Sequence, residues 1–183
     1  ANYQLNDNNR LFISAYAGRD VFSFFDRFNM NWGNITVIVR WNHIFNSRLF
    51  LNTSVIFSNY NYEFKVKNGT NDIRIFSQIR DWNLKQDYQY SINNKNNLRF
   101  GWSSIYHIIR PGEITSNSTS SINDKIQDKR YSFENAFYAS NVFKPNKNLS
   151  ITIGARLSSF IVMGGGNFFN IDEKGKILDT TYY

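Results

Sequence analysis

Cysteine is absent from this 183-residue sequence, proline occurs only twice, and no apolar run exceeds four or five residues. Without cysteine there is no disulfide framework, no thiol nucleophile and no cysteine-ligated zinc or iron–sulfur site. A helical membrane span needs about 20 mostly apolar residues, so the sequence predicts none. The sequence therefore excludes functions that depend on disulfides, on cysteine chemistry or on a helical membrane span.

Glycine and net charge are also modest. There are 10 glycines, and 21 basic residues against 14 acidic ones give a net charge of +7. Glycine is too rare for a collagen-like chain, and coiled-coil heptads are missing. Aromatic residues, in contrast, make up 17% of the chain, and asparagine occurs 27 times. So many aromatic side chains favour a folded chain over a disordered one.

Alternation of apolar and polar residues with a period of two dominates the sequence and predicts an all-β protein. In residues 33–43, Ile35, Val37 and Val39 fall on one face, whereas Thr36 and Arg40 fall on the other. Seven strands are predicted in this way, although the alternation does not fix which residues of the sixth strand share a face. The predicted strands are residues 10–18, 33–43, 49–58, 73–92, 97–109, 131–142 and 149–159.

The connections between these strands alternate in length. Three are short and rich in Asn, Lys and Ser, as tight turns require, and the others are long. The short ones are roughly residues 44–48, 93–96 and 144–148, and the long ones are residues 19–31, 59–72, 110–130 and 162 onward. The pattern predicts an antiparallel up-and-down sheet with short turns at one rim and long loops at the other.

Two architectures compete for this pattern. A soluble β-sandwich, including a carbohydrate-binding one, also has alternating strands, but its strands usually have 3–10 residues. Several strands here exceed ten residues, about the length that a tilted strand needs to cross a bilayer. Short turns opposite long loops are typical of outer-membrane barrels. The sequence therefore favours an antiparallel, up-and-down transmembrane β-barrel segment in contact with outer-membrane lipid.

A barrel predicts one lipid-facing and one lumen-facing side for each strand. A charge at the middle of the lipid-facing side would cost about 2–4 kcal/mol. In the five strands whose alternation is clearest, the charged residues lie on the face opposite the apolar residues, which agrees with this cost. We expect the lumen-facing charges to pair with one another, or with a domain inside the barrel, rather than to bind a ligand. The predicted outward band comprises Ile35, Val37, Val39, Leu51, Val55, Phe57, Leu84, Phe100, Trp102, Ile151, Ile153 and Leu157. The lumen-facing candidates are Arg40, Lys85, Asp87, Arg99, Glu134 and Arg156.

Tryptophan and tyrosine residues lie towards the ends of the predicted strands, where aromatic girdles meet the membrane interfaces. Ordinary packing is the alternative for each of them. These residues are Trp32, Trp41, Tyr60, Tyr62, Trp82, Tyr106 and Tyr138.

Catalytic chemistry has few candidates. His43 and His107 are the only histidines and do not have the H-E-x-x-H spacing, so both are expected on polar strand faces. The three glycines from Gly164 to Gly166 lack the lysine and hydroxyl of a phosphate loop. We therefore expect no catalytic, metal or cofactor site and no enzymatic activity. Basic charge among aromatics suits oligonucleotide-binding barrels, but here the aromatics share faces with Leu, Ile and Val, so no nucleic-acid partner is expected.

Several short motifs resemble those of TonB-dependent outer-membrane receptors, in matching order and spacing from about residue 10 to residue 183. They are Trp32-Gly33-Asn34, Arg40-Trp41-Asn42-His43-Ile44-Phe45-Asn46, Ile79-Arg80-Asp81, Leu84-Lys85-Gln86-Asp87, Phe100-Gly101 with Tyr106-His107, Arg110-Pro111-Gly112-Glu113-Ile114, and Gly154-Ala155-Arg156-Leu157-Ser158. The resemblance implies a Gram-negative outer-membrane barrel of about 22 strands with a plug domain inside. It also implies import of a scarce ligand, such as a siderophore, cobalamin, glycan or peptide, driven by the inner-membrane TonB complex.

Seven strands cannot close a barrel, because bacterial single-chain barrels have even strand numbers and no free edges. Residues 177–183 could form the eighth strand of a small barrel, or the chain could be one arc of a larger one. The resemblance favours the arc. Residues 1–183 are then expected to be a portion of a barrel whose plug domain and remaining strands lie outside this segment.

Overall fold

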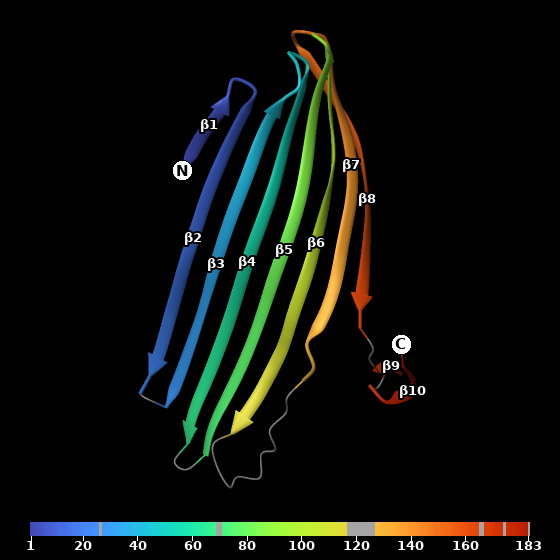
Figure 1. Ribbon diagram of the computed structural model, residues 1–183. Coiled ribbons are helices and arrows are strands. Elements are labelled where there is room, and N and C mark those ends of the chain that lie inside the picture. The colour runs from blue at the N-terminus through green and yellow to red at the C-terminus, as the bar shows by residue number, and fades with distance from the viewer. Residues whose placement is uncertain (26, 69–70, 117–126, 165–166, 174, 183) are drawn as a thin grey trace.

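The structure, a computed structural model, describes residues 1–25, 27–68, 71–116, 127–164, 167–173 and 175–182 (Figure 1). Ten strands account for most of these residues, which confirms the all-β prediction. No helix that could cross a membrane occurs among them. The strands are β1 (Asn2–Asn6), β2 (Asn9–Phe24), β3 (Phe28–Ile44), β4 (Leu49–Asn68), β5 (Asn71–Asn93), β6 (Asn96–Ser116), β7 (Arg130–Asn146), β8 (Leu149–Met163), β9 (Asn167–Ile171) and β10 (Ile177–Tyr182).

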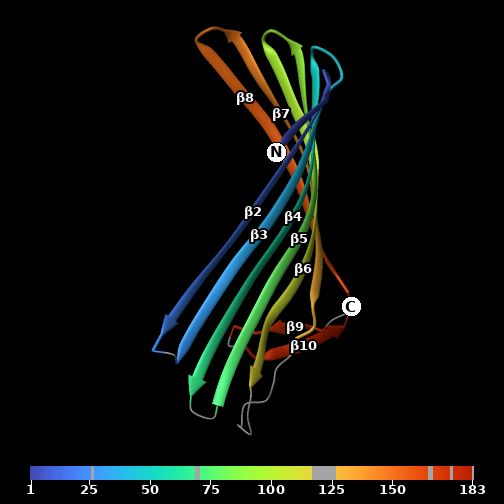
Figure 2. The ribbon, with the colours of Figure 1, turned by 60° about the vertical axis from the view of Figure 1, so that its left-hand side comes forward.

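Strands β1 to β8 form one antiparallel sheet in sequence order, which confirms the predicted up-and-down topology. Figure 2 shows this sheet as one twisted layer. Because no second layer covers it, no large side chain among the described residues is fully buried. The only buried apolar residues among them are Leu51 and Ala136, which are 5% and 1% exposed. The core of a β-sandwich is therefore absent from the part of the chain that the structure describes.

Four turns at one rim of the sheet are stabilised in the same way by an asparagine side chain. In each, an asparagine side-chain oxygen accepts hydrogen bonds from backbone N–H groups two or three residues ahead, for example at 2.9 and 3.0 Å from Asn46. Asparagine readily forms such turns, which explains part of its abundance. The four residues are Asn6, Asn46, Asn93 and Asn146. The three predicted short turns are thus confirmed.

The opposite rim differs from the prediction, because the strands continue where two long loops were expected. β2 runs to Phe24 and β3 begins at Phe28, so residues 19–31 are mostly strand. Likewise β4 ends at Asn68 and β5 begins at Asn71. Of the expected long connections inside the sheet, only the one between β6 and β7 remains, and its residues 117–126 lie outside the described part.

Strands β1 and β9 were not predicted, and β10 was predicted only as a possible eighth strand of a small barrel. The polar segment Asn2–Asn6 forms β1, which pairs with β2 at the edge of the sheet. Residues 177–182 form a strand, but it pairs with β9 in a separate two-stranded sheet. The expectation that this segment could return to the first strand and close a small barrel is therefore wrong for its described residues.

Two irregularities interrupt the pairing of β5 and β6, one beside the turn between Ser91 and Asn93 and the other between Phe76 and Gln78. Phe76 pairs with Glu113 and Gln78 pairs with Arg110, so β6 has one residue more than β5 over this interval. The extra residue falls at Pro111 and Gly112, and proline is tolerated at such a bulge because no ladder hydrogen bond needs its N–H. Beyond the bulge, the side chains of β6 point to the face opposite to the one that simple alternation predicts.

Candidate functional site

Cross-strand register divides the sheet into two chemically different faces, because directly paired residues point to the same side. One row runs through Ile13, Val39, Val55 and Leu84 on four successive strands. We call this side the apolar face. It carries no Asp, Glu, Lys or Arg over the described positions of residues 9–17, 35–43, 49–59, 82–90, 98–108, 131–143 and 151–163, which we call the apolar band.

The height of the apolar band matches a membrane. On β4 it runs from Leu49 to Asn59, ten residue steps or about 33 Å along the strand. A strand tilted by about 40° covers about 25 Å of height over this length, close to the apolar band of outer-membrane barrels. Strands β2 to β6 continue beyond the apolar band at the end opposite the asparagine turns, whereas β7 and β8 end close to its last row.

The register places all twelve residues of the predicted outward band on the apolar face. Seven of them are exposed, with Leu157 the most exposed at 74%. Val37, Phe57, Phe100 and Trp102 are half-buried by neighbours on the same face. The expected exposure is wrong for Leu51, which lies between His43 and Tyr88 in its row and is 5% exposed.

The aromatic residues predicted as girdles are divided between the faces. Trp41 and Trp82 lie on the apolar face near opposite ends of the band, 37% and 50% exposed, and Tyr106 pairs with Trp82. The others point to the opposite side, so the girdle prediction is wrong for them. These are Trp32, Tyr60, Tyr62 and Tyr138.

His43 lies at the end of the apolar band near the turns, and the expectation that it faces the polar side is wrong. Its Nδ1 is 2.7 Å from the side-chain oxygen of Asn9, to which Trp41 Nε1 also donates at 3.0 Å. Its ring also contacts Phe45, with ring centroids 4.4 Å apart. The His43 ring thus belongs to an aromatic group at the turn rim.

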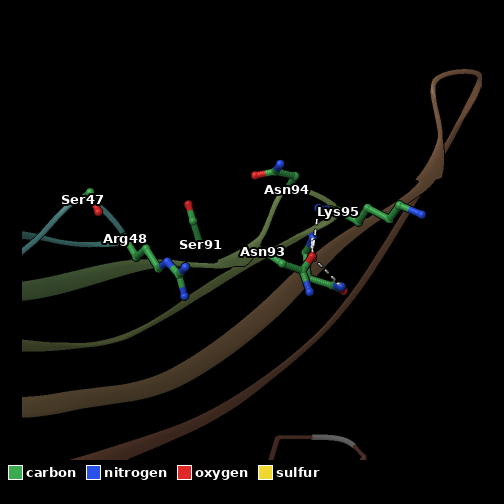
Figure 3. A pocket seen from close by; sticks show the side chains of 7 residues that line it. Ser47, Arg48, Ser91, Asn93, Asn94 and Lys95 are labelled. Carbon is green, nitrogen blue, oxygen red and sulfur yellow. Dashed lines mark hydrogen bonds between the residues drawn. The ribbon is translucent and has the colours of Figure 1, made fainter.

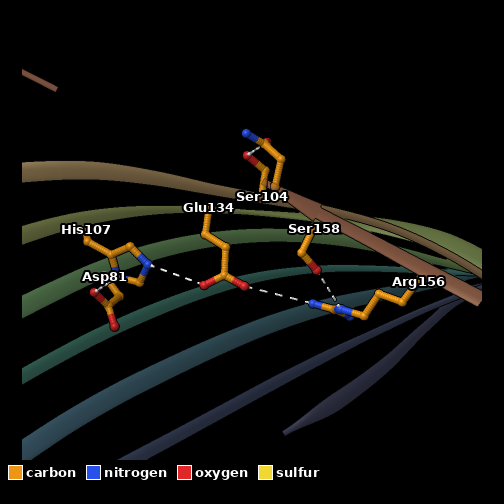
Figure 4. Close-up of polar contacts among 7 residues, drawn as sticks. Asp81, Ser104, His107, Glu134, Arg156 and Ser158 are labelled. Carbon is orange, nitrogen blue, oxygen red and sulfur yellow. Dashed lines mark hydrogen bonds and ion pairs between the residues drawn. The ribbon is translucent and has the colours of Figure 1, made fainter. Parts of the chain in front are cut away.

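The other side, which we call the polar face, carries a network that joins four strands (Figure 4). His107 Nδ1 on β6 is 2.8 Å from Asp81 on β5, and His107 Nε2 is 4.0 Å from Glu134 on β7. Glu134 also lies 4.0 Å from Arg156 on β8, and Arg156 Nε donates to the Ser158 hydroxyl at 3.1 Å. Acidic side chains on β5 and β7 thus alternate with His107 on β6 and Arg156 on β8.

A second part of this network surrounds Tyr138. Its hydroxyl donates to Asp87, which also pairs with Lys85 at 3.0 Å. The cationic groups of Lys85 and Arg156 lie 5.8 and 5.7 Å from the centroid of the Tyr138 ring. Gly101 makes room for this ring, since a Cβ there would lie 2.8 Å from the Tyr138 hydroxyl.

All six charged residues singled out by sequence lie on the polar face. Lys85, Asp87, Glu134 and Arg156 pair within the network. Arg40 and Arg99 are exposed and have no side-chain hydrogen bond or ion pair with any described residue. The sequence did not single out Asp81, His107 or Tyr138 as network members, because alternation assigns a face but not a neighbour on the next strand.

The network does not assemble a catalytic or metal site among the described residues. Asp81, His107 and Ser132 lie in one row, the residue types of a nucleophilic triad. However, the Ser132 hydroxyl is buried and has no hydrogen-bond partner, so it is not activated by His107. No group of three metal-ligating residues occurs in the described segments. The arrangement is suited to holding the strands together and to contacting other charged groups.

Polarity reverses between the two faces beyond the apolar band. Arg19, Glu63 and Arg74 lie on the side of the apolar face, whereas Phe28 and Phe64 lie on the side of the polar face, with ring centroids 4.7 Å apart. This exchange is expected where strands leave the membrane, because their outer side then meets polar groups. The reversal marks the end of the apolar band on these strands.

A hollow of about 810 Å³ lies at the turn rim and is formed by the ends of two hairpins (Figure 3). Arg48 and Lys95 contribute two positive charges to it. The Asn93 side-chain oxygen there already accepts two backbone N–H groups of its own turn. This hollow is a space between turns rather than an assembled ligand site.

Comparisons with known proteins give a structural likeness only. No protein-family model matches the sequence, and no curated protein matches it. Among solved structures, the chain is similar to the crystal structure of BauA, the ferric preacinetobactin receptor from Acinetobacter baumannii, with a TM-score of 0.65. The two are 8% identical in sequence, and the match covers 88% of this chain and 33% of that one. The chain therefore shares the fold of about one third of a ferric siderophore receptor.

Proposed function

We propose that this chain forms part of the barrel of an outer-membrane receptor that imports a scarce ligand. The observation that carries the proposal is the apolar band, about 25 Å high on β4, which holds no Asp, Glu, Lys or Arg up to Arg80 in its last row. The band lies on one face of an eight-stranded up-and-down sheet, and the other charges of these rows lie on the opposite face. Such a sheet suits lipid on one side and a polar lumen on the other. The likeness to a siderophore receptor supports this class of protein.

The sheet needs further strands to close. Neither β1 nor β8 has a second strand partner among the described residues. Each unsatisfied backbone group in a bilayer costs several kcal/mol, so both edges require pairing. We infer that strands from outside the segment complete the barrel.

A plug domain within this barrel would explain two free cations. Arg40 and Arg99 point from the polar face without an acidic partner among the described residues, so carboxylates of a plug are suitable partners for them. Energy would come from the TonB complex, as in the family that the sequence resembles. Because the structural neighbour is a ferric preacinetobactin receptor, a ferric siderophore is the first ligand class to test.

Fractionation of membranes and gel mobility test this proposal. The full-length protein should be found in the outer-membrane fraction and migrate as a heat-modifiable, detergent-stable barrel, whereas residues 1–183 expressed with an outer-membrane signal should not. Recovery of the full-length protein in the soluble fraction would overturn the membrane assignment. A closed, heat-modifiable barrel from residues 1–183 alone would overturn the arc and favour a small barrel.

A further inference from the structure

Basic residues gather on the side of the apolar face, in the last row of the apolar band and beyond it. We call this group the rim cluster. By register its members all point to the side that carries the apolar band, and five are basic against two acidic. They are Arg19, Lys65, Arg74, Arg80 and Arg110, with Glu63 and Glu113.

The rim cluster lies at the depth of lipid headgroups. Arg80 pairs with Asn59, the last row of the apolar band, and Arg19 lies one row further, paired with Gly33. Two residue steps correspond to about 7 Å along a strand. The headgroup layer on each side of a bilayer is about 5–8 Å thick, so these side chains reach it directly from the edge of the band.

Two of the five cations have no partner. Glu63 accepts hydrogen bonds from Arg74 and from Asn31, the latter at 2.9 Å, and pairs with Lys65 at 3.2 Å. Arg110 pairs with Glu113 in the same way. Arg19 and Arg80 are exposed and make no side-chain hydrogen bond or ion pair with any residue that the structure describes. The acidic members therefore leave an excess of three positive charges at this depth.

A hollow of about 320 Å³ accompanies the unpaired charge. It is lined by Arg19, Asn31, Asn61 and Arg74, and also by Glu63, which accepts hydrogen bonds from Arg74 and Asn31 and leaves Arg19 and Asn61 as the uncommitted donors. The space depends on Gly33, because a Cβ there would lie 3.0 Å from the Gly18 carbonyl oxygen and 3.3 Å from the Asn61 side-chain oxygen. Guanidinium and amide N–H groups around a hollow of this kind are donors suited to phosphate oxygens.

We propose that the rim cluster binds the phosphate group of an anionic lipid whose acyl chains lie along the apolar band. The inference rests on the membrane location proposed above and adds a specific lipid contact to it. The positive charge of the rim cluster complements the charge of a phosphate group. The apolar band adjoins the cluster, so the acyl chains of the same lipid can lie against it. A free phosphate ion would gain nothing from the adjacent apolar surface, whereas a lipid contacts both.

Lipid binding to the full-length protein, purified in a neutral detergent, tests the inference by native mass spectrometry. The probes are phosphatidylglycerol and phosphatidylcholine with the same acyl chains. The double variant Arg19→Gln/Arg80→Gln is compared with Arg40→Gln/Arg99→Gln, which removes two unpaired arginines from the polar face instead. With about 1 kcal/mol per basic residue, the first variant should bind phosphatidylglycerol about 30-fold more weakly, and the second should bind as the parent protein does.

The outcomes separate this inference from the proposed function. Equal loss in both variants, no loss in the rim variant, equal binding of the two lipids, or displacement of the lipid by an equal concentration of inorganic phosphate would each overturn the lipid site. Heat-modifiability of each variant is measured in parallel. A protein that forms a barrel without lipid preference refutes only the lipid site, whereas a protein absent from the outer membrane refutes the proposed function.

Discussion

A charge placed in the middle of the apolar band gives a sharp test of the two faces. Val55 lies on β4, four residues from the far edge of the band at Asn59 and six from Leu49. Its row neighbours are Val39 and Leu84, and its side chain is 43% exposed in this single sheet. The substitution Val55→Arg therefore places a guanidinium near the middle of the apolar band, which under the proposed function lies in the hydrocarbon layer.

The expected loss follows from depth. Arginine near the midplane of a barrel costs about 2–4 kcal/mol. The nearest charge on this face of β5 is Arg80, about 13 Å along the strand from Leu84, so no acidic group is within reach to offset the cost. Ile56→Arg is the matched control. Ile56 is the next residue and is also β-branched, but it faces the polar side between Ile38 and Asn83.

Urea unfolding of the full-length protein in a phosphatidylcholine bilayer measures the difference. Val55→Arg should lower the free energy of unfolding by about 2–4 kcal/mol. The loss caused by Ile56→Arg should be smaller than the loss caused by Val55→Arg by about 2 kcal/mol or more. Equal losses, or a larger loss for Ile56→Arg, would refute the assignment of the apolar face to lipid.

Three further substitutions test the polar face by the same unfolding measurement. Gly101→Ala should lose about 1–3 kcal/mol because its Cβ would lie 2.1 Å from the Gln86 carbonyl oxygen, whereas Gly112→Ala, with its nearest atom at 3.5 Å, should be nearly neutral; equal losses would contradict this. Tyr138→Phe removes the hydrogen bond to Asp87 and should lose about 1.5 kcal/mol, and unchanged stability would show that the bond contributes nothing. Arg156→Gln should lose less than about 1 kcal/mol, because its 4.0 Å contact with Glu134 is half exposed, and a loss above about 2 kcal/mol would contradict a weak pair.

Alternation was enough to predict which residues share a face within most of the apolar band. The apolar side of residues 33–43 and of residues 149–159 was correctly read from parity alone, and register confirms that they share one face. For β7 the frame was not readable, because Tyr131, Phe137 and Tyr138 place large aromatics on both faces. Only the pairing with β6 and β8 decides which of them accompany the apolar band.

The far ends of the strands were mistaken for loops for a physical reason. In residues 19–31 alternation continues, but Arg19 and Asn31 now lie on the formerly apolar side, and Phe22 and Met30 on the other. The sequence assigns residues to faces by asking which alternate positions are apolar. Where the polar and apolar sides exchange, that assignment no longer holds along the strand. The polar residues then resemble a loop in the sequence.

The polar-face network was predictable only in part. That Lys85 and Asp87 pair could be expected from their spacing of two on one strand. The contact of His107 with Asp81 joins residues 26 positions apart and depends on the register of two long strands. A shift of one residue in that register would move His107 to the other face.

The bulge at Pro111 and Gly112 indicates where a strand of this sheet can gain or lose one residue. One residue added to a strand reverses the direction of every side chain that follows it. Between the asparagine turns and the last row of the apolar band, one inserted residue would turn charged side chains from the polar face to the apolar face. Only insertions of two residues, which restore the original faces, would therefore be tolerated there. At the bulge the shift falls after Arg110, beyond the last row of the band, where both orientations meet polar groups. Single-codon insertions and deletions among relatives should therefore accumulate beyond this row and be rare between it and the asparagine turns.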